Sequence, residues 1–289
     1  MYQYNSIPER MEYIQKLFLE AGALARTAGG WQELLPLLDQ EPDEYRSVGY
    51  EGFSFELAMK DIDTMGALGE WKEFRTATQE HAFHLDIGLG WALAKREVAI
   101  GVYIDSVDSI TGSMILDGIG YYHALFKGRN TLKNKYVPAE LEQQGLSGFD
   151  QGVGRRLWYM AKGNVQEAVN LLHGFPFERR GDLFRGVGIA CGYVGGNSEK
   201  ELRILEKLSA EHKDQLQLGI ALASLSRILS NSVTPSVQRS YQIICGKSDS
   251  HLDISLTDAT KKFLYLYNNG DNSNNWFARF KSDLLQSGL

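Results

Sequence analysis

The sequence predicts an all-α protein, a right-handed α–α solenoid of helix–turn–helix repeats of about 33 residues, similar in plan to tetratricopeptide repeats (TPR-like). Two observations predict this fold class. A Gly-apolar-Gly step followed by an apolar helical stretch recurs along the chain, and no alternating β-branched run bounded by an Asn-Gly or Asp-Gly turn interrupts the series. Because 43% of the 289 residues are hydrophobic and 11% are aromatic, the chain can bury a large core.

The glycine steps set the period of the repeat. Their second glycines are Gly90, Gly120, Gly154 and Gly188, and a degenerate copy adds Gly219, so that the spacings are 30, 34, 34 and 31 residues. Glycine inside a helix costs roughly 1 kcal/mol relative to alanine, so the recurrence needs a reason. We expect close packing between neighbouring helices to be that reason. The alternative is a ligand lying against bare backbone at helix N-termini.

The pattern is continuous enough for a single helical-repeat domain over residues 1–289. Residues 1–45 are expected to form N-terminal capping helices, residues 46–230 hold the repeats, and residues 231–289 continue in C-terminal helices. The expected helices at the two ends are Pro8–Ala21 and Trp31–Leu38, then 235–245, 256–267 and 276–285, with a polar Asn-rich loop at 268–275.

Capping residues place the helices within the repeats. Asp150 is expected to cap the first helix of one repeat, and Asn164 with Glu167 makes a capping-box-like start for its second helix. Ser198 with Glu201 repeats that pattern one unit later.

Charge and cysteine content narrow the class of protein. The net charge of −6 argues against a nucleic-acid partner, because phosphate binding needs a basic surface. The two cysteines, Cys191 and Cys245, lie in apolar surroundings and suit a reduced, cytoplasmic chain. The N-terminal residues resemble no signal peptide, and the longest apolar runs fall far short of the roughly 20 residues of a membrane span.

Five arginines lie near the predicted starts of two helices: Arg155, Arg156, Arg179, Arg180 and Arg185. Cations there oppose the helix dipole, so something anionic should compensate for them. Ion pairing between adjacent repeats, with Asp150, Glu178 or Asp182, is one explanation. The other is an anionic ligand, such as a carboxylate or a phosphopantetheine phosphate.

Acidic residues precede three of the glycine steps. Asp86, Asp117 and Asp150 are expected to act as N-caps, although equivalent positions in successive repeats could also form a row of carboxylates on one concave surface.

Three histidines are candidates for chemistry: His81, His84 and His123. His81 and His84 with Asp86 have a facial spacing, but no di-iron or zinc motif accompanies them, so we expect no metal and no cofactor. His123 could serve acid–base chemistry if it faced a groove; packing on an aromatic face is the alternative.

Aromatic side chains gather in the first helices of the repeats: Trp91, Tyr121, Tyr122, Trp158, Tyr159 and Tyr193. Most should belong to the core. Those that face the concavity would form an aromatic-walled groove suited to a long unsaturated chain.

One block of sequence is similar to a known family. FDQGVGRRLWYMAKGNVQEAVNLLHGFPFERRGDLFRGVGIACGYVGG (149–196) resembles the signature of the UnbL-type enediyne biosynthesis protein family, a bacterial conserved domain of unknown function. GYEGFSFELAM, HLDIGLGWALAK and DGIGYYHALF extend the resemblance over roughly residues 45–230, whereas residues 231–289 match no pattern of the family.

The resemblance implies an accessory protein in enediyne or polyene-type polyketide biosynthesis. Such a protein would bind, and could process, a hydrophobic polyketide-like intermediate in a helical groove. The alternative is a non-catalytic helical-repeat scaffold for a partner protein. The resemblance implies no catalytic residue. The candidate ligand-binding residues are Asp150, Gln151, Arg155, Trp158, Arg180, Asp182 and Arg185 from the motif, with His84, Asp86 and His123 from the patterns above.

Overall fold

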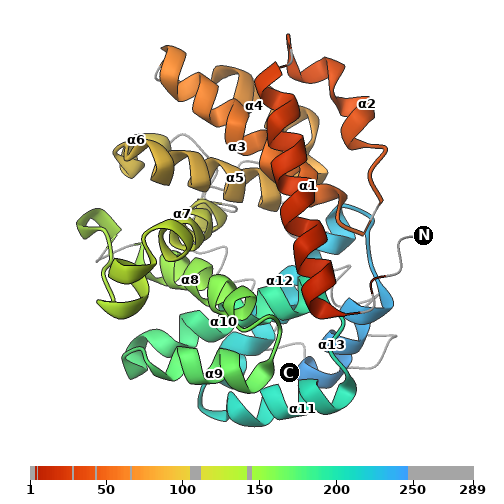
Figure 1. The fold of residues 1–289 in the computed structure, drawn as a ribbon, viewed down its shortest axis with the longest axis vertical. Helices are drawn as coiled ribbons and strands as arrows, with labels where there is room; N and C mark the ends of the chain where they lie inside the picture. Colours follow the sequence, from red (N-terminus) through yellow and green to blue (C-terminus); the bar gives the residue numbers. More distant parts are fainter. Residues whose placement is uncertain are drawn as a thin grey trace, which may run out of the picture.

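The computed structural model describes residue 4 and residues 6–27, 29–42, 44–65, 67–104, 112–141 and 145–246 (Figure 1). Within these ranges every regular element is helical and no strand occurs, which confirms the all-α prediction. None of the described helices has both the length and the apolar character needed to cross a membrane. The expected helices at 256–267 and 276–285, and the loop at 268–275, lie outside the described residues.

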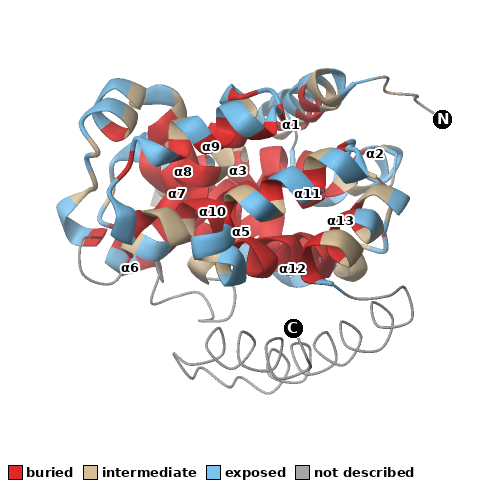
Figure 2. Ribbon diagram, turned by 90° about the horizontal axis from the view of Figure 1, so that it is seen from below, coloured by how far each residue is buried: buried red, intermediate tan, exposed pale blue. Residues whose placement is uncertain are grey.

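Seven long helices form one continuous row, which we call the inner row. They are α1 (Ile7–Thr27), α3 (Arg46–Met65), α5 (Ala82–Arg96), α7 (Gly112–Phe126), α8 (Leu146–Met160), α10 (Phe177–Val194) and α12 (Lys213–Leu229). Each packs along the next one in this order. Their buried faces form the centre of the molecule (Figure 2).

Shorter helices flank the inner row. They are α2 (Leu35–Leu38), α4 (Gly69–Ala77), α6 (Ile100–Ile104), α9 (Val165–His173), α11 (Glu199–Leu208) and α13 (Pro235–Cys245). Single turns lie at Trp31–Glu33, Gln79–His81, Ala139–Leu141 and Ala210–His212, and a π-helical turn lies at Arg129–Lys133. Helices α9, α11 and α13 contact one another in sequence and form a second row. Long and short helices alternate except between α7 and α8, where the described residues form only turns, so a regular series of helix pairs is not confirmed.

The glycine steps are where the inner helices cross most closely. A Cβ atom built on Gly118 would lie 2.2 Å from the carbonyl oxygen of Ile87 in α5. One built on Gly120 would lie 1.9 Å from the carbonyl oxygen of Phe149 in α8. The first glycine of the step therefore faces the preceding helix and the second faces the following one. This confirms close packing as the reason for the glycines, since only a hydrogen fits at either position.

The contacts also correct one detail of the predicted repeat. Gly219 touches the carbonyl oxygen of Arg185 in the preceding helix, so it holds the first glycine position and not the second. Gly52 has the same relation to Phe18 of α1. Helix α1 therefore packs along α3 through the same kind of glycine contact as the other helices of the inner row.

The predicted caps are confirmed in part. Asn164 accepts a hydrogen bond from the backbone of Glu167 at the start of α9, and Ser198 with Glu201 forms a complete capping box on α11. The prediction of an N-cap at Asp150 was wrong, because α8 begins four residues earlier and this side chain lies inside the helix. Asp86 in α5 and Asp117 in α7 are internal for the same reason.

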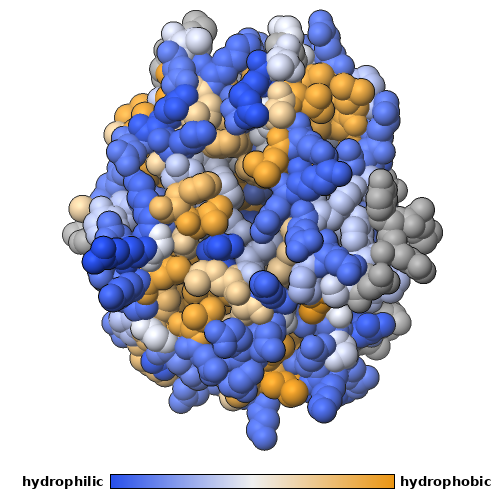
Figure 3. Space-filling model, viewed as in Figure 1, coloured by the Kyte–Doolittle hydropathy of each residue, from blue (hydrophilic) through white to orange (hydrophobic). Residues whose placement is uncertain are grey.

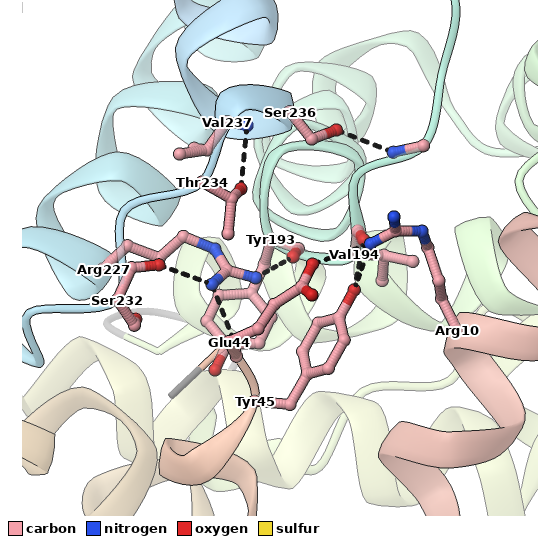
Figure 4. Close-up of polar contacts among 11 residues, drawn as sticks. Arg10, Glu44, Tyr45, Tyr193, Val194, Arg227, Ser232, Thr234, Ser236 and Val237 are labelled. Carbon is pink, nitrogen blue, oxygen red and sulfur yellow. Dashed lines mark hydrogen bonds and ion pairs between the residues drawn. The ribbon is translucent and has the colours of Figure 1, made fainter. Parts of the chain in front are cut away.

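The inner row curls back on itself, and Arg227 of α12 holds the junction together (Figure 4). Its guanidinium donates hydrogen bonds to the carbonyl oxygens of Glu44, Ser232 and Tyr193. Beside it, the hydroxyl of Tyr45, at the start of α3, donates to the carbonyl oxygen of Val194 at the end of α10, over 2.8 Å. These contacts join the early and late parts of the row, so the structure does not confirm an open TPR-like solenoid. Its handedness remains a prediction.

Candidate functional site

The curled row encloses a central pocket with a volume of about 400 Å³. Every inner helix supplies part of its wall, as shown by Phe18, Glu51, Trp91, Tyr121, Tyr159, Tyr193 and Leu222, one from each helix in chain order. At the mouth, Leu19 and Phe126 line the pocket while remaining 67% and 62% exposed. Figure 3 shows hydrophobic patches of this kind on an otherwise hydrophilic face. Pockets of this size with mostly apolar walls are typical of small-molecule sites.

The predicted aromatic wall is present in part. Trp91, Tyr121, Tyr159 and Tyr193 line the pocket. Trp91 stacks on Tyr121 with ring centroids 5.4 Å apart, and Tyr121 meets Tyr159 edge-on at 5.8 Å. Trp158, a candidate ligand-binding residue, is instead fully buried in the core and does not reach the pocket. The wall therefore offers flat, rigid rings to an extended ligand.

Arg155 is the candidate from the family-like motif that reaches the pocket. It lies in the second half of α8, so the prediction that Arg155 and Arg156 belong to a first helical turn was wrong. The Arg155 guanidinium forms an ion pair with Asp117 of α7, which is wholly buried. Burial acts to lower the pKa of Arg155, but the charges of Asp117 and Glu51 outweigh it and raise the pKa.

A chain of polar contacts runs from this ion pair across three helices. Gln151 of α8 donates to Asp117 over 2.7 Å and accepts a hydrogen bond from Arg185 of α10 over 2.6 Å. Arg185 in turn pairs with Asp182 at 2.7 Å. The structure thus joins four of the candidate residues, Gln151, Arg155, Asp182 and Arg185, through Asp117. Only the Arg155 end meets the pocket, so the remaining members hold that end in place.

Asp150 and Asp86 belong to separate buried ion pairs. Asp150 binds Arg179 through two hydrogen bonds, one of 2.8 Å from Nε and one of 2.5 Å from Nη2. Asp86 binds Arg75 of α4 in the same two-pronged way, at 2.6 and 3.1 Å. Each carboxylate is directed at its own partner, so the alternative of a carboxylate row on one concave surface was wrong.

Arg180 lies outside the pocket. Its guanidinium donates to the carbonyl oxygens of His173 and Phe175 at the end of α9, both at 2.9 Å. It therefore binds carbonyl groups at a helix C-terminus, which is a favourable place for a cation.

The histidines divide between pocket and core. His84 lines the pocket, and burial lowers its pKa well below the usual value, so the ring is neutral near pH 7. His81 instead bonds to Ser47 over 2.8 Å and stacks on Tyr50, so the structure does not bring the His81, His84 and Asp86 set together. No metal-binding group of His, Cys, Asp and Glu is found in the part of the chain that the structure describes.

His123 lies near the end of α7, away from the pocket lining. It is 7% exposed and meets Phe149 edge-on at a centroid distance of 5.7 Å. Burial lowers its pKa to about 4. This arrangement is that of a packed histidine, the alternative stated for it above.

Glu51 of α3 is the pocket carboxyl group that the sequence analysis missed. It is 5% exposed, and none of the described residues forms a hydrogen bond or an ion pair with it. Burial raises its pKa to about 7, against the opposing charge of Arg155. Its position in the sequence could have indicated the pocket. Glu51 comes directly before Gly52, which is the first glycine of a step, and the pocket residue Ile87 comes directly before Gly88 in the same way.

The buried state of Glu51 predicts a pH-dependent stability. The folded-state pKa of about 7 lies above the ordinary 4.5, so ionisation disfavours the folded state. The wild-type free energy of unfolding should fall as pH rises from 4.5 through about 7, by up to about 3 kcal/mol. Glu51→Gln should lack this part of the fall and be the more stable protein above pH 7, as measured by urea unfolding. If the free energy of unfolding of wild type and of Glu51→Gln depended on pH in the same way, the buried placement of Glu51 would be contradicted. Glu12→Gln, at an exposed site on α1, is the control for loss of a carboxylate.

The comparisons with known proteins identify a family. A family model described as "Protein of unknown function (DUF1702)" matches residues 2–283. No curated protein and no solved structure matches the chain. The match also covers most of residues 231–289, the part for which the sequence analysis found no family pattern. The family description assigns no function, so the enediyne connection stays a prediction. Because the match spans nearly the whole sequence, this chain belongs to the DUF1702 family of proteins of unknown function.

Proposed function

We propose that this protein binds an elongated, largely apolar small molecule in its central pocket. The observation that carries the proposal is the convergence of all seven inner helices on one aromatic-walled cavity of about 400 Å³. The sequence resemblance described above suggests the ligand class, a polyene-type polyketide intermediate, and a role as an accessory biosynthetic protein. The two free, buried cysteines favour a cytoplasmic location.

The pocket also contains a group suited to processing the ligand. Glu51 lies in the pocket wall with a pKa near neutrality, which allows one carboxyl group both to donate and to accept a proton. A bound conjugated chain would lie beside it.

The scaffold alternative has less support. A helical-repeat scaffold presents an extended concave surface to its partner. Here the concave side of the inner row is the wall of the pocket, and contacts such as Tyr45 to Val194 join the early and late parts of the row.

Ligand capture tests the proposal directly. The protein is purified from a host that makes polyenes, and the bound material is examined by absorbance and mass spectrometry. In parallel, the purified protein is titrated with a long-chain conjugated tetraene alcohol, whose fluorescence rises in an apolar pocket. We expect saturable binding with one site per chain.

A matched pair of variants locates the site. Ile189→Trp adds bulk at a pocket-lining position and should abolish tetraene binding. Ile204→Trp makes the same change on α11, outside the central pocket, and should leave binding unchanged. Absence of tetraene binding to the wild type, or equal binding by Ile189→Trp and the wild type, would refute the proposal.

A further inference from the structure

Arg156 is a pocket-lining cation that no carboxylate neutralises among the described residues. It follows Arg155 in α8, but the two arginines have different surroundings. Arg155 is paired with Asp117, whereas the Nε atom of Arg156 is buried without a hydrogen-bond partner. A guanidinium in an apolar pocket gains strongly from an anionic partner.

The other charges of the pocket leave this one uncompensated. Asp117 offsets Arg155, and burial keeps His84 neutral. Glu51 is the remaining pocket carboxyl, and burial holds it largely protonated below about pH 7. Below about pH 7 the pocket as a whole therefore carries a positive charge, located at Arg156.

Trp91 supplies a second donor, and it contacts the tyrosine beside Arg156. Tyr121 lies beside Arg156, whose charge partly offsets the rise that burial gives the tyrosine pKa. Trp91 stacks on the same tyrosine, and its indole Nε1 is also buried without a hydrogen-bond partner. Trp91 lies 6.1 Å from the exposed Phe126 ring, measured between centroids, so these donors are near the pocket mouth. Ala190 of α10, with Leu222 and Ala223 of α12, contributes an apolar part of the wall.

We infer that the ligand is a long-chain carboxylate whose anionic group is bound by Arg156, with the Trp91 indole as a further donor. Its apolar chain would extend along the aromatic wall into the region of Ala190 and Leu222. This inference rests on the proposed function and adds an anchoring site to it. Arg156 is then the residue that determines the preference for acids over neutral chains.

Two matched probes test the anchor: a long-chain conjugated tetraene acid and the corresponding alcohol. They share the apolar chain and differ in the charged group. We expect wild type to bind the acid at least about tenfold more tightly than the alcohol, as a charge-assisted contact in a desolvated site would give. Arg156→Gln should bring this ratio close to one without weakening alcohol binding, and Arg156→Lys should restore part of the preference. Thermal unfolding of each variant, with and without probe, checks that the fold is retained.

The possible outcomes separate the two proposals. Equal binding of acid and alcohol by the wild type overturns the anchor and leaves the apolar pocket in place. Loss of both probes in Arg156→Gln and in Arg156→Lys also overturns it, because the arginine would then be needed for pocket shape. No binding of either probe by the wild type overturns the proposed function itself.

Discussion

Replacing Gly186 with alanine is expected to lower the free energy of unfolding by about 3–5 kcal/mol, or to prevent folding. The added Cβ would lie 1.9 Å from the carbonyl oxygen of Gln151 and 2.7 Å from the backbone nitrogen of Arg155. Both atoms belong to the backbone of α8, so no side chain can rotate away. Helices α8 and α10 must separate, which also moves the Arg185–Gln151 contact and the pocket wall at Arg155. Urea unfolding followed by circular dichroism measures the loss.

Gly181 provides the matched control in the same helix. A Cβ there meets the flexible Gln215 side chain at 3.4 Å, an ordinary contact distance. Gly181→Ala should therefore leave stability unchanged, or raise it by up to about 1 kcal/mol through helix propensity. If Gly186→Ala and Gly181→Ala changed the free energy of unfolding equally, the glycine steps could not be sites of close helix crossing. An equal loss at Gly181 and Gly186 would point instead to general sensitivity of α10.

The second large effect is expected at Arg227. Arg227→Met keeps an unbranched apolar stem but removes the donors to the carbonyl oxygens of Glu44, Ser232 and Tyr193. These acceptors lie at the junction of the inner row, where Arg227 is 0% exposed, so water cannot replace the guanidinium without opening the structure. We expect a loss of about 3–5 kcal/mol in the free energy of unfolding. Weakened tetraene binding should accompany it, because Tyr193, which Arg227 contacts, lines the pocket.

An exposed arginine controls for loss of charge. Arg203 on α11 pairs with Glu199 one turn away, and its side chain is 61% exposed. Arg203→Met should change the free energy of unfolding by less than about 0.5 kcal/mol. A similarly small effect at Arg227 would show that the junction does not hold the row together.

The sequence predicted the local structure well because local structure depends on near neighbours. Ser198 with Glu201 and Asn164 with Glu167 are three residues apart, and both pairs cap helices as expected. The N-cap predicted at Asp150 was wrong, although a short acidic residue before a glycine step is a typical N-cap. Its buried partner is Arg179, 29 residues later, so ion pairing between repeats, the first of the two explanations given for the arginine cluster, is confirmed for Asp150.

The site was predictable only in part. The aromatic residues suggested a groove, and four of the six named line the pocket. Glu51 was missed because a single glutamate within a helix is most often a solvent-exposed residue. Arg156 was named with the arginine cluster, but its place in a pocket was not predicted. They became pocket residues only when the row curled and brought α3 to face α8.

By itself, the sequence determined the helices and the spacing at which they cross. Glycine leaves a clear trace, since an interior helical position that admits only a hydrogen must lie against another backbone. The tertiary structure alone decided that the row curls and which side chains meet inside it. That curvature is the sum of small rotations between neighbouring helices, set by the combined volumes of side chains distant in sequence. This curvature produces the pocket and places Arg156 in its wall. It also brings together the helices that Arg227 joins.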